Sequence, residues 1–238
     1  MLSVVLAPGL LCDGRLWSGV RGHLQRPVVE LDFSRHDRLE SMAANILEST
    51  PERFVLAGFS MGGMAAVLAA AEAPERVAAM VLIDTHAEPE TPARKAVRAR
   101  QLESVADGRF RSLVMEQLKP AYFSPAAERR SERALVAAMA LELGPRVFRR
   151  HVLALMSRPD PSPLLARLSM PTVVMTGRDD ALVPPTFADN LARAAPNARL
   201  VVLEDCGHMA PLEQPARVAA EIEAVSRAVE EFAHVHTR

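Results

Sequence analysis

A serine between closely spaced glycines gives the first indication of chemistry in this chain. The stretch Gly58-Phe-Ser-Met-Gly62 has the pattern G-x-S-x-G and lies between the apolar run Phe54–Gly58 and an alanine-rich helical pattern. A serine at a sharp strand-to-helix turn can stand exposed as a nucleophile, and small residues two positions away avoid clashes across that turn. The main-chain N–H of Met61 would then point at a developing oxyanion. We therefore predict Ser60 as the nucleophile and Met61 as an oxyanion donor.

The alternatives for this stretch are a chance match in a loop and a phosphate-binding loop. Gly58 and Gly63 have the spacing of a phosphate-binding loop, but Met64 and Ala65 follow where lysine and serine or threonine are required. The position of the serine between a strand and a helix is the context that supports the nucleophile.

A serine nucleophile requires a base, and His208 is the best placed of the seven histidines. It follows the apolar run Leu200–Leu203 in a turn-rich stretch that contains Gly207 and Pro211. Such a histidine can lie over the carboxyl edge of a parallel sheet, where active sites of open α/β sheets are found. A capping or surface histidine is the alternative.

The residue that orients the base could be one of three aspartates. Asp179 and Asp180 follow the apolar run Thr172–Thr176, and Asp84 follows another apolar run. Adjacent aspartates point in different directions, so local sequence does not choose between Asp179 and Asp180. Asp84 could equally cap a helix or a turn.

Alternating elements must position these side chains. Short apolar runs rich in valine alternate with helical patterns, which predicts βαβ units and a mostly parallel, doubly wound α/β sheet with helices on both faces. The predicted strands are Leu2–Ala7, Val28–Leu31, Phe54–Gly58, Ala78–Ile83, Thr172–Thr176 and Leu200–Leu203. The predicted helices are Leu16–Leu24, Leu39–Leu47, Met61–Ala73, Pro185–Ala194 and Gln214–Phe232.

The alternation stops between residues 86 and 168. This stretch is helical throughout, with predicted helices at 92–106, 108–118, 126–141 and 146–156, and prolines 159, 161 and 163 predict a stiff linker after it. We predict a core of residues 1–85 and 169–238 with a helical insertion at 86–168. The insertion has 15 basic and 9 acidic residues. Its arginine pairs, such as Arg129-Arg130 and Arg149-Arg150, are either solvated helix faces or a means of steering an anionic substrate.

These motifs together resemble the α/β-hydrolase superfamily, over essentially the whole chain. The family pattern G-x-x-D-x-x-V-P matches Gly177–Pro184 with Asp180 in the acid position, and its histidine loop matches Gly207–Pro215. The resemblance implies the order Ser60, Asp180, His208, a cap domain at 86–168, and Leu10 as the second main-chain oxyanion donor. It also implies that the family's first two antiparallel strands are absent, since a core strand begins at once.

The resemblance implies a serine hydrolase that cleaves a small-molecule ester or lactone through an acyl-enzyme, without metal or organic cofactor. The same triad could serve acyl transfer, C–C bond hydrolysis or peroxyacid formation, and a ligand-binding protein on the hydrolase scaffold is a further alternative. We expect Phe59, Leu182 and Met209, which flank the three predicted catalytic residues, to contact substrate.

Bulk properties restrict the partners. The formal net charge of −1 does not indicate binding to nucleic acid or to an anionic membrane, and no apolar run is long enough to span a bilayer. The two cysteines form no disulfide framework, and the N-terminus lacks the features of a signal peptide. We expect a cytoplasmic protein, and apolar surface on the insertion would allow a homodimer.

Overall fold

Six parallel strands form the centre of the computed structural model, which describes residues 1–118 and 122–236. The order across the sheet is β2-β1-β3-β4-β5-β6, and every pairing between neighbouring strands is parallel. The strands are β1 (Ser3–Ala7), β2 (Val28–Glu30), β3 (Phe54–Phe59), β4 (Val77–Ile83), β5 (Thr172–Gly177) and β6 (Ala198–Leu203). The prediction of a mostly parallel α/β sheet is confirmed, and each predicted strand is present within two residues of its expected ends.

Both faces of the sheet are buried, which explains why the strands have continuous apolar sequences. In β1, Val4 and Leu6 face one hydrophobic cluster, whereas Val5 and Ala7 face the other. The four side chains are fully buried. Alternate residues of each strand therefore supply two separate cores, one on each face of the sheet.

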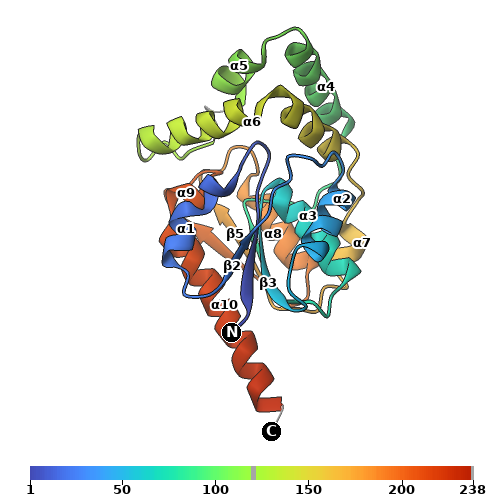
Figure 1. Cartoon of the computed structure of the whole chain (residues 1–238), viewed down its shortest axis with the longest axis vertical. Helices are drawn as coiled ribbons and strands as arrows, with labels where there is room; N and C mark the ends of the chain where they lie inside the picture. The colour runs from blue at the N-terminus through green and yellow to red at the C-terminus, as the bar shows by residue number, and fades with distance from the viewer. Residues whose placement is uncertain (119–121, 237–238) are drawn as a thin grey trace.

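Helices cover the two faces in the order that right-handed crossovers require. One face packs against η1 (Gly14–Trp17), α1 (Ser18–His23) and α10 (Pro215–His236), and the other against α2 (Leu39–Glu48), α3 (Met61–Glu72) and α8 (Pro185–Ala194) (Figure 1). A short helix, α9 (Ala210–Glu213), precedes α10. No helix within residues 1–118 and 122–236 is long and apolar enough to cross a membrane.

The segment between β4 and β5 is helical. It consists of α4 (Pro92–Ala106), α5 (Phe110–Ser112), the π-helical turn η2 (Leu113–Leu118), α6 (Arg130–Met156) and α7 (Ser162–Leu165). Its helices before the last one lie over one end of the sheet, whereas the last, α7, lies beside α3 (Figure 1). Two helices predicted at 126–141 and 146–156 correspond to α6, which is broken at Gly144 by backbone angles of φ 79° and ψ −179°. The expected stiff linker instead contains α7, because Pro163 can occupy the first turn of a helix.

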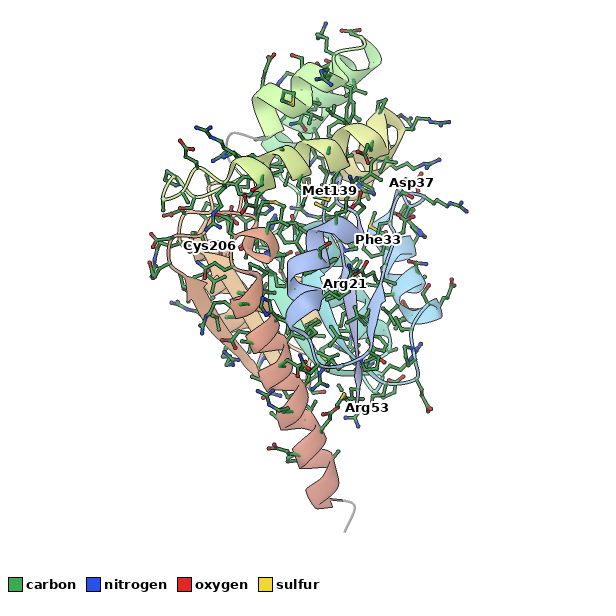
Figure 2. All side chains as sticks on the ribbon, turned by 60° about the vertical axis from the view of Figure 1, so that its left-hand side comes forward. Arg21, Phe33, Asp37, Arg53, Met139 and Cys206 are labelled. Carbon is green, nitrogen blue, oxygen red and sulfur yellow. The ribbon has the colours of Figure 1, made fainter. Side chains whose placement is uncertain are left out.

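The helical segment shares a core with the sheet as well as having one of its own. Met139 of α6 is fully buried in the same cluster as Trp17 and Val20, and Figure 2 shows it at the junction with the sheet layers. A third cluster, which includes Phe110 and Phe148, joins the helices of the segment to one another. The segment is therefore packed against the sheet and covers its carboxyl end.

Candidate active site

Ser60 stands at the turn between β3 and α3 in a strained conformation. Its φ is 51° and its ψ −115°, values that a residue with a side chain seldom adopts. The turn is fixed on both sides, because Ser60 N–H donates to the Ile83 carbonyl at 2.9 Å and the Thr85 hydroxyl donates to the Ser60 carbonyl at 2.7 Å. The fold thus holds the hydroxyl at the carboxyl edge of the sheet despite the backbone strain.

The glycines on either side of Ser60 are required by close approach of the backbone. A Cβ on Gly62 would lie 2.3 Å from the Ala7 carbonyl oxygen, and one on Gly58 would lie 2.7 Å from the Gly62 carbonyl oxygen. Both distances are far below van der Waals contact with atoms that cannot rotate away. The G-x-S-x-G spacing therefore has a steric cause at both ends of the turn.

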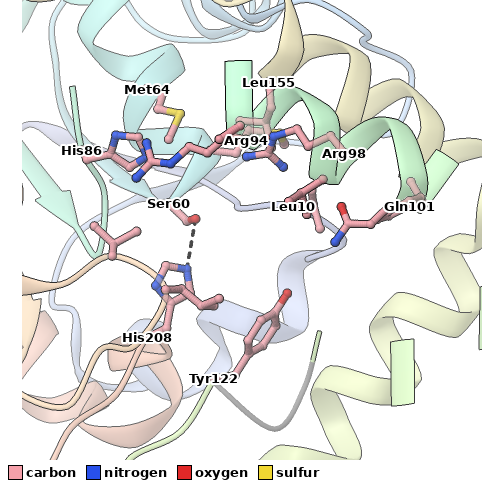
Figure 3. Close-up of a pocket in the computed structure, with 16 residues that line it drawn as sticks. Leu10, Ser60, Met64, His86, Arg94, Arg98, Gln101, Tyr122, Leu155 and His208 are labelled. Carbon is pink, nitrogen blue, oxygen red and sulfur yellow. Dashed lines mark hydrogen bonds between the residues drawn. The ribbon is translucent and has the colours of Figure 1, made fainter. Parts of the chain in front are cut away.

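A chain of hydrogen bonds joins Ser60, His208 and Asp180. Nε2 of His208 lies 3.1 Å from the Ser60 Oγ (Figure 3). Nδ1 of the same ring lies 2.8 Å from Asp180 Oδ2. His208 and Asp180 are buried, with 5% and 3% of their surface exposed. With the Nδ1 proton donated to the carboxylate, Nε2 is free to accept the serine proton, which is the arrangement of a nucleophile, a base and an orienting acid.

The structure separates the three candidate aspartates. Asp180 Oδ1 accepts the N–H groups of Leu182 and Val183 at 2.8 and 2.9 Å, which aims Oδ2 at His208. Asp179 turns the other way and accepts the Ser124 hydroxyl at 2.5 Å. Of the neighbouring pair, only Asp180 is therefore brought to the base.

Asp84 lies beside the hydrogen-bonded series of Ser60, His208 and Asp180, but its own hydrogen-bond partners are different. Its carboxylate accepts the N–H of Gly177 and the N–H of Ala210, each at 3.0 Å. Burial, followed by the nearby charge of Asp180, raises the pKa of the Asp84 carboxyl well above its usual range. Asp84 thus ties the end of β5 to the start of α9, and the loops next to these two segments carry Asp180 and His208.

Glu213 holds the histidine loop in place. Its buried carboxylate accepts the N–H groups of Gly207 at 2.9 Å and of Met209 at 3.3 Å, on either side of His208. It also accepts the N–H of Ser124 at 3.1 Å, from the segment that covers the sheet. Burial raises the pKa of this carboxyl, while its three N–H donors and Arg129 oppose the increase. The loop is therefore built around one carboxylate.

The predicted oxyanion donors border the same space as Ser60. Leu10 follows β1 and Met61 is the first residue of α3, and both line one cavity with Ser60 and His208. The N–H of a first helical residue has no acceptor within its own helix, so that of Met61 is available to a ligand. Leu10 and Ser60 follow β1 and β3, the adjacent strands where the strand order reverses and where open α/β sheets bind ligands.

The cavity above Ser60 has a volume of about 430 Å³. Of the three residues expected to contact substrate, Leu182 lines it and is 40% exposed, whereas Phe59 and Met209 do not belong to its lining. We correct the expectation for these two. Phe59 points into the core on the α1 side of the sheet, where it meets the edge of Trp17, and Met209 is buried in that same core.

Polar side chains on the cavity wall come from parts of the chain that the motifs did not indicate. Figure 3 shows His86, Arg94, Arg98, Gln101 and Tyr122 around Ser60 and His208. Arg94, Arg98 and Gln101 are one turn apart on α4, a spacing that was visible in the sequence. No local motif tells such a helix face from a solvated one.

A metal ion would have to be held by several side chains together. No group of three or more His, Cys, Asp or Glu side chains suited to a metal ion occurs among residues 1–118 and 122–236. Cys12 and Cys206 are both buried and unpaired, and burial raises the pKa of each thiol, that of Cys12 to about 12.

Known proteins resemble this chain over almost its full length. Residues 4–221 match the model of the alpha/beta hydrolase family. A pimeloyl-[acyl-carrier protein] methyl ester esterase from Aromatoleum aromaticum is 31% identical, with 82% of each chain covered. A thermophilic esterase from Thermogutta terrifontis, solved with malate bound, is 30% identical with a TM-score of 0.85, covering 96% of this chain and 90% of its own. The enol-lactonase from Burkholderia xenovorans LB400 is 20% identical with the same TM-score, over 95% and 91%, and shows the fold alone.

Proposed function

The chain belongs to the alpha/beta hydrolase family, and from this premise we propose that it is a serine hydrolase that cleaves a small-molecule carboxylic ester or lactone. The observation that carries the proposal is the hydrogen-bonded series Ser60–His208–Asp180 at the base of a cavity. The relatives support the reaction class, because two proteins at least 30% identical are named as esterases.

In the first half of the reaction, Ser60 Oγ attacks the carbonyl carbon of the ester while His208 Nε2 takes its proton. Asp180 holds the imidazole and stabilises its protonated form. The carbonyl oxygen becomes an oxyanion, which accepts hydrogen bonds from the main-chain N–H groups of Leu10 and Met61. Loss of one such donor typically lowers the rate about 10²–10³-fold.

In the second half, the tetrahedral intermediate collapses and His208 gives its proton to the leaving alkoxide. The acyl group remains on Ser60 Oγ as an ester. Water then attacks this ester while His208 takes one of its protons. The carboxylic acid leaves as His208 returns that proton to Ser60 Oγ, which restores both residues. No redox step or added co-reactant is required.

We also propose that residues 86–168 are a cap on a core of residues 1–85 and 169–238. Helices α4, α5 and α6 lie over the carboxyl end of the sheet, and α4 and α6 supply side chains to the cavity wall. A cap of this kind would restrict the cavity's access to solvent and select the substrate by shape and charge.

Hydrolysis of short p-nitrophenyl esters tests the proposal. We expect the wild type to release p-nitrophenol with saturation kinetics, and Ser60→Ala to lower kcat by about 10⁴-fold or more. Ser112→Ala, an exposed serine of α5, is the matched control and should retain full activity. Product analysis with added alcohol separates hydrolysis from acyl transfer, since transfer would convert the alcohol into a new ester. Folded wild type without activity above that of Ser60→Ala would contradict the proposal.

A further inference from the structure

Two arginines of α4 give the cavity a basic wall. Arg94 and Arg98 are four residues apart, which places them on one face of the helix. Both line the cavity, and Figure 3 shows their guanidinium groups directed into it, on the side that faces Ser60. Each guanidinium offers a planar set of N–H donors suited to binding a carboxylate through two hydrogen bonds.

The positive charge of this wall is only partly neutralised. The Glu90 side chain is buried and is shared by two arginines, since it pairs with Arg98 at 3.3 Å and with Arg158 at 2.7 Å. Glu88 is turned toward Asn190, whose amide donates to it at 3.2 Å. Within residues 1–118 and 122–236, no ion pair joins Arg94 to a carboxylate, and its guanidinium lies over the Phe187 ring, 5.1 Å from the centroid. One carboxylate thus serves two guanidinium groups, and no carboxylate of the described residues forms an ion pair with Arg94 beside the cavity.

His86 lies on the same side of the cavity as Arg94, because its ring centroid is 5.4 Å from that of Phe187, the ring that Arg94 covers (Figure 3). Burial, followed by the charges of Arg158, Arg94 and Arg98, lowers the pKa of His86 to about 3. His86 therefore stays neutral at physiological pH and does not add to the charge. The remaining charge on this side of the cavity comes from the arginines.

We propose that Arg94 and Arg98 form an anion subsite, and that the substrate is an ester or lactone that carries a carboxylate apart from its scissile bond. The inference rests on the proposed function, since it names the substrate class for the site of Ser60. A single unpaired guanidinium matches one negative charge, which favours a carboxylate over a doubly charged phosphate.

The rest of the lining fits a short hydrocarbon link between the two ends of such a substrate. Apart from its polar side chains, the cavity wall is apolar. These residues would contact methylene groups, while the carboxylate meets α4 and the ester carbonyl meets Ser60. The apolar side chains of the lining are Leu10, Met61, Met64, Ala93, Val97, Phe148, Leu155, Leu182 and Val183.

The arginine pairs that the sequence drew attention to do not take part. Arg129 donates to the Glu213 carbonyl at 2.9 Å and Arg150 to the Ser34 carbonyl at 2.9 Å, so both have structural partners. Neither they nor their neighbours Arg130 and Arg149 line the cavity. Of the insertion's basic residues, Arg94 and Arg98 rather than these arginine pairs supply the charge at the cavity.

Matched esters measure the preference directly. Monomethyl adipate carries a carboxylate where methyl hexanoate has a methyl group, on the acyl side of the ester. In the same way, 4-acetoxybutanoate carries a carboxylate where butyl acetate has a methyl group, on the alcohol side. We expect wild type to favour the anionic ester of at least one pair by roughly tenfold or more in kcat/KM, the scale of one charge-assisted hydrogen bond. The pair that shows the preference identifies which side carries the carboxylate.

Three variants link the preference to the subsite. Arg94→Gln and Arg98→Gln should each lower the ratio of anionic to neutral kcat/KM by roughly tenfold, and Arg94→Lys should retain part of it because the charge remains. Arg100→Gln, an exposed position on the same helix outside the cavity, is the control and should leave the ratio unchanged. Equal ratios in wild type and in the two glutamine variants would overturn the inference.

A binding measurement separates this inference from the proposed function. If no ester is turned over, the hydrolase proposal fails, and calorimetric titration of Ser60→Ala with adipate then decides the subsite alone. Binding that is weakened by adding Arg94→Gln, but not by adding Arg100→Gln, supports the subsite. Absence of adipate binding to Ser60→Ala, with no anionic preference in turnover, overturns it.

Discussion

The main-chain N–H of Leu11 donates to Nδ1 of His151 at 3.2 Å, and this bond joins the loop after β1 to helix α6. Nε2 of the same imidazole lies 3.1 Å from the Phe33 carbonyl oxygen, so the neutral ring donates there and accepts from Leu11. Leu11 has a φ of 54°, in the left-handed region. His151 thus holds a strained residue next to the proposed oxyanion donor Leu10.

Replacing His151 should displace the loop after β1, which carries the proposed oxyanion donor Leu10. It should leave Ser60, His208 and Asp180 in place. We expect His151→Phe to lower kcat for p-nitrophenyl esters by about 10-fold or more, because a displaced donor costs part of the 10²–10³ that such a group contributes. KM should change much less, since the oxyanion forms only after binding. His23→Phe, at an exposed position of α1, is the control for general effects of the substitution. An unchanged kcat in His151→Phe would show that the loop is held by other contacts.

The stability of the fold should depend on pH through His151. Burial lowers its pKa to about 4, whereas an unfolded histidine titrates near 6.5. Between these values the unfolded chain binds a proton that the native protein does not, so stability falls as the pH falls. The contribution from His151 should drop on the order of 2 kcal/mol between pH 8 and pH 5.

Urea unfolding of wild type and His151→Gln at both pH values measures this difference. Other groups titrate equally in the two proteins, so their contributions cancel. We expect the stability of wild type to fall more steeply with acidification than that of the variant. Parallel pH profiles would mean that His151 can be protonated in the native fold.

Glu213 should be among the most sensitive positions of the histidine loop. Its side chain accepts three N–H groups, and its Oε2 lies 3.7 Å from Arg129 Nε. The substitution Glu213→Ala removes the carboxylate and leaves the three N–H groups buried without an acceptor. We therefore expect the free energy of unfolding to fall by about 3–5 kcal/mol. Glu204→Ala, which breaks an exposed pair with Arg178, should have little effect. Similar midpoints of urea unfolding for the two variants would contradict this role.

Two glycines should respond in opposite ways to the same substitution. Gly62→Ala places a methyl group 2.3 Å from the Ala7 carbonyl oxygen, and we expect it to abolish activity or to prevent folding. Gly22→Ala in α1 meets no atom within 4 Å and should stabilise the protein by up to about 1 kcal/mol through higher helix propensity. Thermal unfolding and ester turnover compare the pair. A fully active, stable Gly62→Ala would show that the turn can relax.

The sheet was predictable from the sequence because its strands are buried on both faces and so have continuous apolar, β-branched runs. The positions of Ser60 and His208 were also predictable, since each lies in a turn with local requirements. The aspartate was not decided by local sequence, because Asp179 and Asp180 differ only in where their side chains turn. That direction depends on Ser124 and His208, which are distant in the chain.

The parts of the site that depend on packing between distant segments were not predictable. Arg94 and Arg98 resemble any basic helix face until α4 is placed over the sheet, and His151 resembles a core histidine until the loop after β1 meets it. The prediction for Phe59 was wrong for a different, local reason. Sequence proximity to Ser60 suggested the pocket, but the alternation of β3 turns its side chain toward Trp17.

Covalent labelling tests the central claim, that Ser60 is the nucleophile, most directly. A p-nitrophenyl alkylphosphonate mimics the tetrahedral intermediate, and its adduct on the serine oxygen is stable enough for mass spectrometry. We expect one adduct per chain in wild type, located on the peptide that contains Ser60, with loss of ester hydrolysis in proportion to labelling. Ser60→Ala should take up no label, and His208→Ala should label far more slowly because the base is missing. Ester hydrolysis that persists in fully labelled protein, or labelling that continues in Ser60→Ala, would contradict the account.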